Sequence, residues 1–139
     1  MSRPVGTEAT AGDGEDSGES YRTSLENFEL NYHILSTARQ LAEACDELEQ
    51  AAVKYANAHR YFKREWAKAY LIAPGKTVDD RKCHADLESD ELRFENYLQE
   101  GLMQASLERV RSLRGTLSAF QTLANKQKEE MAFDRTGPH

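Results

Sequence analysis

The chain has few of the residues that build disulfide frameworks, metal clusters or membrane spans. Two of its 139 residues are cysteines, and no apolar run is long enough for a signal peptide or a membrane helix. Cys45 and Cys83 show no spacing pattern, so we expect free thiols in a reducing cytoplasm. His59 and His84 add no second pair at ligand spacing, and His59 is interpreted as a polar residue that sets helix register. The sequence therefore predicts no metal site.

Signatures of catalysis and of β-structure are also missing. The chain has no glycine-rich phosphate loop, no nucleophile elbow and no Cys/His pair placed by strands. No segment alternates apolar and polar residues as a half-buried strand does. We therefore expect a non-enzymatic, all-α protein without a cofactor.

Composition predicts one helical domain with a thin core. Hydrophobic residues make up 39% of the chain and charged residues 30%. The segment 1–23 is rich in glycine, serine, threonine and acid, and we expect a disordered acidic tail there. The helical domain should cover residues 24–133, and a disordered tail should follow at 134–139. The acidic tail could be inert or could compete with nucleic acid for a basic surface.

One apolar stripe dominates the first half of the domain. Its members recur every three or four residues: Ile34, Ala38, Leu41, Cys45, Leu48, Ala52, Tyr55, His59, Phe62, Trp66, Ala69 and Ala73. This period predicts a long helix with a narrow packing seam. The helix should start between residues 32 and 36 and end at Ala73-Pro74-Gly75, because proline disfavours helix in the residue before it and glycine permits the turn.

A second helical half follows the turn. Thr77 can cap a short helix, with Asp80 three residues later, and the chain could bend, unwind or continue at 86–91. A second long helix is expected over 92–132, with Gly101 and Gly115 as weak points. Its seam comprises Phe94, Tyr97, Leu98, Leu102, Ala105, Val110, Leu113, Leu117, Phe120, Leu123, Ala124 and Met131. The expected fold is an elongated antiparallel helical hairpin that oligomerises through coiled-coil-like seams.

Charge is segregated along this acidic chain. The net charge is -6, yet residues 51–82 hold eight basic against three acidic residues. Residues 1–50 and 83–105 are acidic by comparison. Local fields decide where a polyanion docks, so an acidic chain can still bind nucleic acid.

The basic block predicts a nucleic-acid surface. Four cations lie off the apolar seam, with Tyr61 and Tyr70 among them, and further cations follow the turn. Cations that follow a phosphate backbone beside rings that stack on bases are typical of non-specific single-strand binding. The candidate residues are Arg60, Lys63, Arg64, Lys68, Tyr70, Lys76, Arg81 and Lys82. The alternative is an ordinary solvated helix face.

The last long helix offers a candidate oligomerisation surface. Leu113, Leu117, Phe120 and Ala124 step by four, three and four residues, beside the small residues Gly115 and Ser118. They could pack on the first helix or form a subunit interface, and the two interpretations are compatible.

The order of these elements resembles a known family. A basic segment with Lys68-Ala69-Tyr70-Leu71, then Gly75-Lys76-Thr77, the helix start Asp79-Asp80-Arg81-Lys82 and a Leu/Ala-rich C-terminal helix look like the UvsY-type recombination mediators of tailed phages. The likeness covers about residues 36–133, and Tyr70 stands where the family's motif has arginine. It implies an oligomer that binds single-stranded DNA and helps to load a strand-exchange recombinase onto DNA coated by single-strand-binding protein, in the host cytoplasm if the chain is phage-encoded. Lys68 would contact phosphate.

A second interpretation assigns no nucleic acid to the chain. The seam could instead bind another protein, which would make the chain a helical adaptor or scaffold of a phage. This interpretation predicts no salt-dependent binding of oligonucleotides and a monomer or dimer in light scattering.

Overall fold

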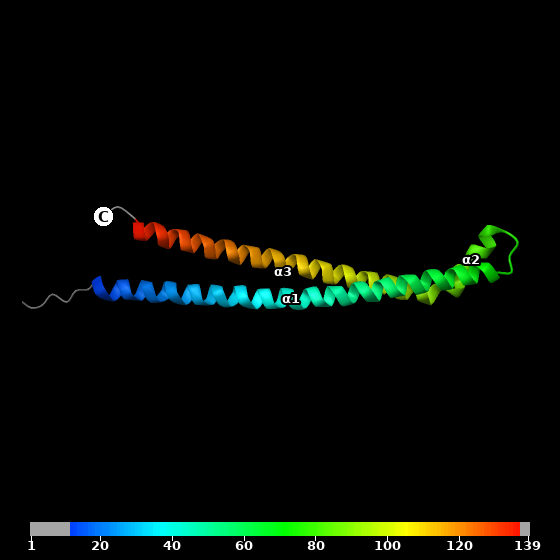
Figure 1. The fold of residues 1–139 in the computed structure, drawn as a ribbon, viewed down its shortest axis with the longest axis horizontal. Coiled ribbons are helices and arrows are strands. Elements are labelled where there is room, and N and C mark those ends of the chain that lie inside the picture. Colours follow the sequence, from blue (N-terminus) through cyan, green and yellow to red (C-terminus); the bar gives the residue numbers. More distant parts are fainter. Residues whose placement is uncertain (1–11, 137–139) are drawn as a thin grey trace, which may run out of the picture. The chain divides into compact units, whose positions relative to one another are not determined.

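The computed structural model describes the backbone of residues 12–136 and the side chains of residues 18–135. Three helices follow one another in the chain: α1 (Gly12–Ile72), α2 (Val78–Glu88) and α3 (Asp90–Thr136), as Figure 1 shows. Residues 12–136 contain no strand. The prediction of an all-α protein is confirmed.

Helix α1 begins about twenty residues before the expected start between residues 32 and 36. Residues 12–23, expected to be disordered, are helical, while residues 1–11 lie outside the described part of the chain. Once a helix has formed downstream, each added residue gains a backbone hydrogen bond without a new nucleation cost. Thr23 lies within the helix, and its Oγ1 donates to the Glu19 carbonyl oxygen at 3.0 Å. Polar composition therefore did not stop the helix.

Helix α3 is also longer than expected. It begins at Asp90 rather than near residue 92 and continues to Thr136, four residues past the expected end. Residues 134–136 of the predicted C-terminal tail are helical, and residues 137–139 lie outside the described part.

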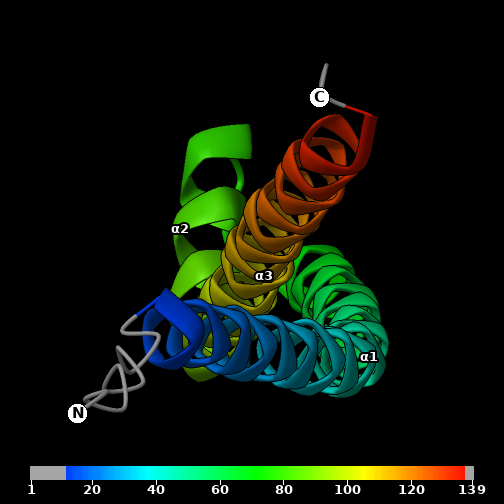
Figure 2. The same ribbon diagram turned by 90° about the vertical axis from the view of Figure 1, so that its left-hand side faces the viewer.

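The chain divides into two units, and α1 and α3 contribute to both. One unit comprises the segments up to Ser36 and from Leu117 onward. Within it, the His33 and Phe120 rings stack with centroids 5.5 Å apart, and Asn27 Nδ2 lies 3.8 Å from Met131 Sδ. These pairs run in opposite sequence order along the two helices. Figure 2 shows the two segments of this unit in blue and in orange to red.

The other unit comprises Thr37–Thr116. Arg109 Nη1 of α3 forms an ion pair with Glu47 Oε2 of α1 at 2.5 Å, and Trp66 Nε1 of α1 donates to Asp86 Oδ1 of α2 at 2.9 Å. The buried hydrophobic residues are Ala44, Ala69, Ala73, Ala85 and Val110, so small side chains form most of the core. The expectation of a thin core agrees with this composition.

The apolar stripe predicted on α1 faces inward for most of its length. Ala69 and Ala73 are buried, and Leu41, Leu48 and Tyr55 are half-buried. At two positions the buried residue comes one earlier than predicted: Thr37 and Ala44 are buried, whereas Ala38 is exposed and Cys45 half-buried. A count of apolar residues selects Ala38 over the neighbouring Thr37, because threonine is not counted as apolar.

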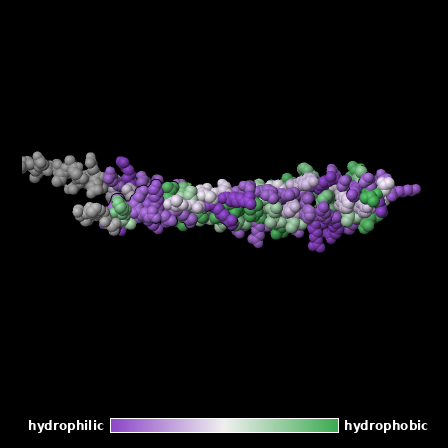
Figure 3. All heavy atoms as spheres, turned by 90° about the horizontal axis from the view of Figure 1, so that it is seen from above, coloured by the Kyte–Doolittle hydropathy of each residue, from purple (hydrophilic) through white to green (hydrophobic). Residues whose placement is uncertain are grey.

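The first part of the predicted α3 seam is wrong. Phe94, Tyr97, Leu98, Leu102 and Ala105 are exposed. The residues that turn inward are Asn96, Met103, Ser106, Leu107 and Val110, of which Asn96 and Val110 are buried. Steps of seven back from the buried Val110 arrive at Met103 and Asn96, so heptad continuity fixes which face packs inward. Apolar side chains consequently reach the surface beside polar ones, as the mixed green and purple spheres of Figure 3 show.

The turn after α1 agrees with its predicted chemistry. Helix α1 ends at Ile72, just before Ala73-Pro74-Gly75, and Thr77 is the N-cap of α2. The Thr77 hydroxyl accepts a hydrogen bond from the Asp80 backbone amide at 3.1 Å. Asp79 and Asp80 occupy the first turn, where acids complement the helix dipole.

Gly75 permits the turn because it has no side chain. Its φ is not positive, so the turn does not use the left-handed conformation. A Cβ at this position would instead lie 2.5 Å from Asp80 Cβ. Glycine is required because the loop passes close to the first turn of α2.

A single residue separates α2 from α3. Ser89 is buried, its hydroxyl donates to the Ala85 carbonyl oxygen at 2.6 Å, and its backbone amide donates to the same oxygen. The Arg93 amide then donates to the Ser89 carbonyl oxygen at 2.9 Å. Of the three alternatives for 86–91, the chain interrupts its helix briefly and resumes.

Candidate nucleic-acid interface

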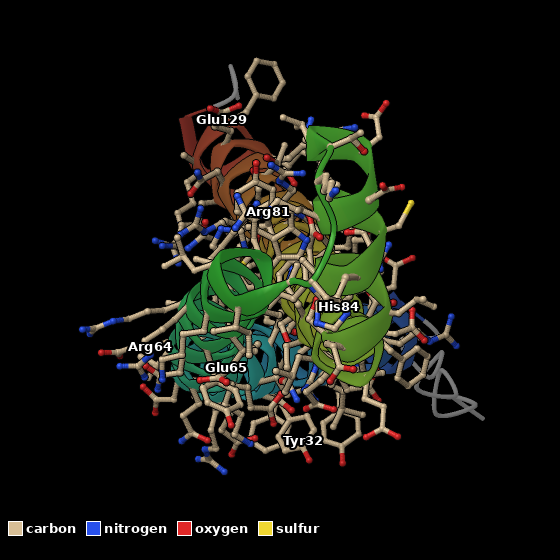
Figure 4. The ribbon with its side chains drawn as sticks, turned by 90° about the vertical axis from the view of Figure 1, so that its right-hand side faces the viewer. Tyr32, Arg64, Glu65, Arg81, His84 and Glu129 are labelled. Carbon is tan, nitrogen blue, oxygen red and sulfur yellow. The ribbon has the colours of Figure 1, made fainter. Side chains whose placement is uncertain are left out.

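The last turns of α1 carry four exposed cations on the face away from the buried row. These residues, called the basic row below, are Arg60, Lys63, Arg64 and Lys68. The helix period separates them from Phe62, Trp66 and Ala69, which are half-buried or buried. In Figure 4, Arg64 points away from α2. The sequence prediction that these four cations lie off the seam is therefore correct.

Glu65 is the one acid in the segment 51–78, and it neutralises part of the positive charge of the basic row. Its Oε1 lies 3.2 Å from Lys68 Nζ, and the Lys68 side chain is 64% exposed. An exposed ion pair of this kind is weak and is easily exchanged for a phosphate. Lys63 Nζ lies 5.7 Å from the centroid of the Phe62 ring and has no acidic partner among the described residues.

Tyr70 and Arg81 belong to a different arrangement. The Arg81 guanidinium lies 5.3 Å from the centroid of the Tyr70 ring, and Arg81 Nη2 donates to the Leu71 carbonyl oxygen at 3.3 Å. Tyr70 also stacks on Trp66 at 5.5 Å. Both residues are half-buried and fasten α2 to the end of α1. Their contact with DNA stays a prediction, and it would have to compete with these contacts.

Tyr61 is the ring that stays accessible beside the basic row. Its side chain is 47% exposed, and it lies three residues before Arg64 and seven before Lys68. That spacing places all three side chains on neighbouring parts of one helix face. Tyr61 can therefore offer a stacking surface for a base.

The remaining predicted cations sit on other elements. Lys76 is exposed in the loop between α1 and α2, and Lys82 is exposed on α2, next to the inward-turned Arg81. The eight candidates thus form three groups: the basic row, the Tyr70–Arg81 contact, and two separate lysines.

The predicted oligomerisation residues contact the chain's own α1 where their contacts are defined. Phe120 stacks on His33, and Ala124 lines a hollow of about 240 Å³ together with Asn27 and Leu30. Leu113 and Leu117 are half-buried. These contacts agree with the intramolecular interpretation, while the subunit interface at these residues stays a prediction.

The candidate metal ligands are not brought together. Within residues 18–135, no three His, Cys, Asp or Glu side chains are grouped so as to hold a metal ion. His59 is half-buried against Tyr55, with ring centroids 5.8 Å apart, and both cysteines are free. His59 thus lies on the packed face of α1, and its role in setting helix register stays a prediction.

Sequence reasoning assigned no function to one exposed surface of α1. Five large apolar side chains of α1 are 45% to 70% exposed: Tyr21, Leu25, Phe28, Tyr32 and Leu35. They step by four, three, four and three residues, so the same periodicity that identified the buried stripe could have found them. Tyr21 lies in the predicted acidic tail, and the other four lie in the predicted helical domain, off the predicted packing seam.

Comparisons with known proteins add no relative. No family model matches the chain, and neither the curated proteins nor the solved structures contain a match. None of the helices formed by the described residues combines the length and apolar character needed to cross a membrane.

Proposed function

We propose that the protein binds single-stranded DNA through the basic row and acts as an oligomeric recombination mediator. The observation that carries the proposal is the basic row itself: four exposed cations at helical spacing on one face of α1, with Tyr61 beside them. Cations that neutralise phosphates and a ring that stacks on bases are the two components of sequence-tolerant single-strand binding.

The affinity of one chain should be modest. The basic row spans the nine residues 60–68, or about 12 Å of helix, and so contacts only a few nucleotides. An oligomer repeats the row, and linked weak sites gain affinity through effective concentration. Oligomerisation is therefore part of the proposed function. The reverse sequence order of the two α1–α3 contacts in the unit that holds His33 and Phe120 supports the antiparallel hairpin expected from the sequence.

The mediator role rests on the resemblance to the UvsY-type family. In that role the protein is non-enzymatic and cytoplasmic, in the host if the chain is phage-encoded. Its partners are DNA coated by single-strand-binding protein and a strand-exchange recombinase of phage or host. Lys68, with Lys63 and Arg64 beside it, holds the strand by its phosphates.

The test is a fluorescence-anisotropy titration of a labelled oligothymidine at low and rising salt. Replacing Lys63, Arg64 and Lys68 together by alanine should abolish binding at low salt and leave the oligomeric mass unchanged. For single strands the slope of log affinity against log salt changes by about 0.7 per phosphate contact, so losing three contacts should reduce it by about 2.

A matched control removes the same charge elsewhere. Arg111, Arg114 and Lys126 are exposed on α3, and their triple replacement by alanine lowers the net charge equally. This variant should bind almost as the wild type does. Unchanged binding by the basic-row variant, or equal loss by both variants, would refute the proposal that the basic row is the DNA site.

An adaptor function has one observation in its favour. Phe94, Tyr97, Leu98 and Leu102 are 44% to 68% exposed on α3, with Glu91 and Glu95 beside them. Exposed apolar residues with a polar rim are typical of protein interaction sites. The buried seam first considered for this role is occupied by intramolecular packing, so an adaptor would use this exposed face. It predicts no salt-dependent binding of the oligothymidine.

A further inference from the structure

We propose that a second copy of this chain docks antiparallel on the face of α1 formed by Tyr21, Leu25, Phe28, Tyr32 and Leu35, called the outer stripe below. The inference rests on the oligomer in the proposed function and assigns its interface. It is independent of whether the oligomer binds DNA.

The outer stripe has the spacing of a coiled-coil seam, and α3 does not cover it in the part of this unit that the structure describes. Asn27 and Leu30 face α3, where they line the hollow with Ala124 and Met131. The outer stripe lies on the opposite side of α1, because its members are offset from this face by about half a helical turn. The exposed fractions are 69% for Tyr21, 70% for Phe28, 63% for Tyr32 and 68% for Leu35.

The area is sufficient for a dimer. A buried aromatic side chain covers roughly 150–250 Å², and about two thirds of that is still exposed on each ring here. Three aromatic and two leucine side chains from each copy would together remove on the order of 1,000 Å² from water. This reaches the lower limit for a specific interface.

Charges beside the outer stripe favour the antiparallel arrangement. Arg22 follows Tyr21 and Glu29 follows Phe28, so both charged residues flank the same side of the outer stripe. The other side carries Ser24 and Asn31, which are uncharged. A two-fold axis between Leu25 and Phe28 sets Arg22 opposite Glu29 of the second copy, and symmetry repeats this pair. A parallel pair would set the charged side against the uncharged one.

The occupant is therefore a second copy rather than an unrelated protein. The outer stripe is complementary to itself in the spacing of its apolar side chains and in its flanking charges, which is the requirement of an isologous interface. It shares no residue with the basic row, so docking there uses no DNA-binding side chain. Nor does it use Leu113, Leu117, Phe120 or Ala124, the oligomerisation residues expected from the sequence.

The test is the mass of the full chain in multi-angle light scattering over a concentration series. The wild type should have at least twice the 15.8 kDa mass of one chain. The variant Leu25→Ser/Phe28→Ser/Tyr32→Ser should lose this association, while Phe94→Ser/Tyr97→Ser/Leu98→Ser on α3 should keep it. Circular dichroism checks that each variant is still helical.

Charge reversal tests the direction of docking. Arg22→Glu should weaken association about tenfold, because it sets a glutamate opposite Glu29 of the other copy at both symmetry-related positions. Glu29→Arg should weaken it equally, because it sets two arginines opposite each other in the same way. The double variant Arg22→Glu/Glu29→Arg should restore association, which a parallel pair does not predict.

Each other result has a defined meaning. A wild type that is monomeric at every concentration, or an oligomer that the serine variant of the outer stripe leaves intact, overturns the inference. An oligomer that the serine variant abolishes but that binds no oligothymidine upholds the inference and refutes the DNA-binding proposal. Failure of the double reversal to restore association overturns the antiparallel arrangement.

Discussion

Replacing Gly75 by alanine should destabilise the protein, although the same change at two other glycines should stabilise it. Gly75 lies in the loop between α1 and α2. An added Cβ would lie 2.5 Å from Asp80 Cβ, 3.4 Å from the Asp80 carbonyl carbon and 3.5 Å from the Arg81 amide nitrogen. Two of these neighbours are backbone atoms in the first turn of α2. The loop or the helix start must therefore move.

The cost follows from what that movement disturbs. Forcing one extra methyl group into a packed site costs about 1–3 kcal/mol. A shift of the first turn of α2 also strains the hydrogen bond from the Asp80 amide to the Thr77 hydroxyl, and such a cap contributes about 1 kcal/mol. We expect Gly75→Ala to lower the free energy of unfolding by about 2 kcal/mol.

Gly101 and Gly115 provide matched controls within α3. No atom lies within 4 Å of a Cβ added at either position. Alanine is favoured over glycine in a helix interior by about 1 kcal/mol, because glycine loses more backbone entropy on folding. Gly101→Ala and Gly115→Ala should each raise the free energy of unfolding by about that amount.

Urea denaturation followed by circular dichroism at 222 nm measures all three variants. Comparison of their midpoints at equal protein concentration removes any effect of association on apparent stability. A Gly75→Ala variant that is as stable as the wild type would contradict the close approach of the loop to α2. Destabilisation at Gly101 or Gly115 would contradict their open helical surroundings.

Three further substitutions test single contacts. Trp66→Phe keeps a ring but loses the 2.9 Å hydrogen bond to Asp86, so urea denaturation should show a loss of about 1 kcal/mol, and Asp86→Ala should cost less in this background than in the wild type because only the Asp86–Arg93 ion pair is then left to lose. Asn96→Leu should raise the melting temperature. The Asn96 Oδ1 is buried without a donor among the described residues, and such an unpaired oxygen lowers the stability of the fold by about 1–3 kcal/mol. A lower melting temperature would contradict this reasoning. Glu65→Gln should raise the affinity for the oligothymidine about two- to fivefold by freeing Lys68, and the gain should vanish in a Lys68→Ala background.

Local chemistry made the turn between α1 and α2 predictable. Pro74 removes a backbone donor and constrains the residue before it, and Thr77 followed by Asp80 is a capping pattern that acts within four residues. Neither effect depends on distant parts of the chain. The end of α1 and the start of α2 therefore follow directly from the sequence.

The inward face of α3 was not predictable in the same way. Between Phe94 and Leu102 the large apolar residues lie on one face, and the face that packs inward carries Asn96 and Met103. Counting apolar residues selects the first face, because it contains more hydrophobic surface. The inward face is instead continuous with the buried Val110, and the burial of Val110 depends on how distant parts of the chain pack.

In the candidate site, too, features within one helix were predictable from the sequence and contacts between helices were not. Periodicity alone places Arg60, Lys63, Arg64 and Lys68 away from the seam, and the structure has them exposed. The pairing of Tyr70 with Arg81 required knowledge of how α2 returns against α1, because the two residues are separated by the turn. Sequence spacing therefore identified the cations on one helix but not the contacts between two helices.

The two sides of the last turns of α1 are separate surfaces, and this separation bears on the proposed function. The inward side is held by the Trp66–Asp86 hydrogen bond and by Arg81, which reaches both Tyr70 and the Leu71 carbonyl oxygen. The basic row uses none of these side chains, so a bound strand need not break any contact that fastens α2. Because the helix that carries the basic row is already fixed, binding has to order only the ends of the lysine and arginine side chains. A small set of cations on a rigid helix can therefore contribute more to affinity than the same cations on a loop.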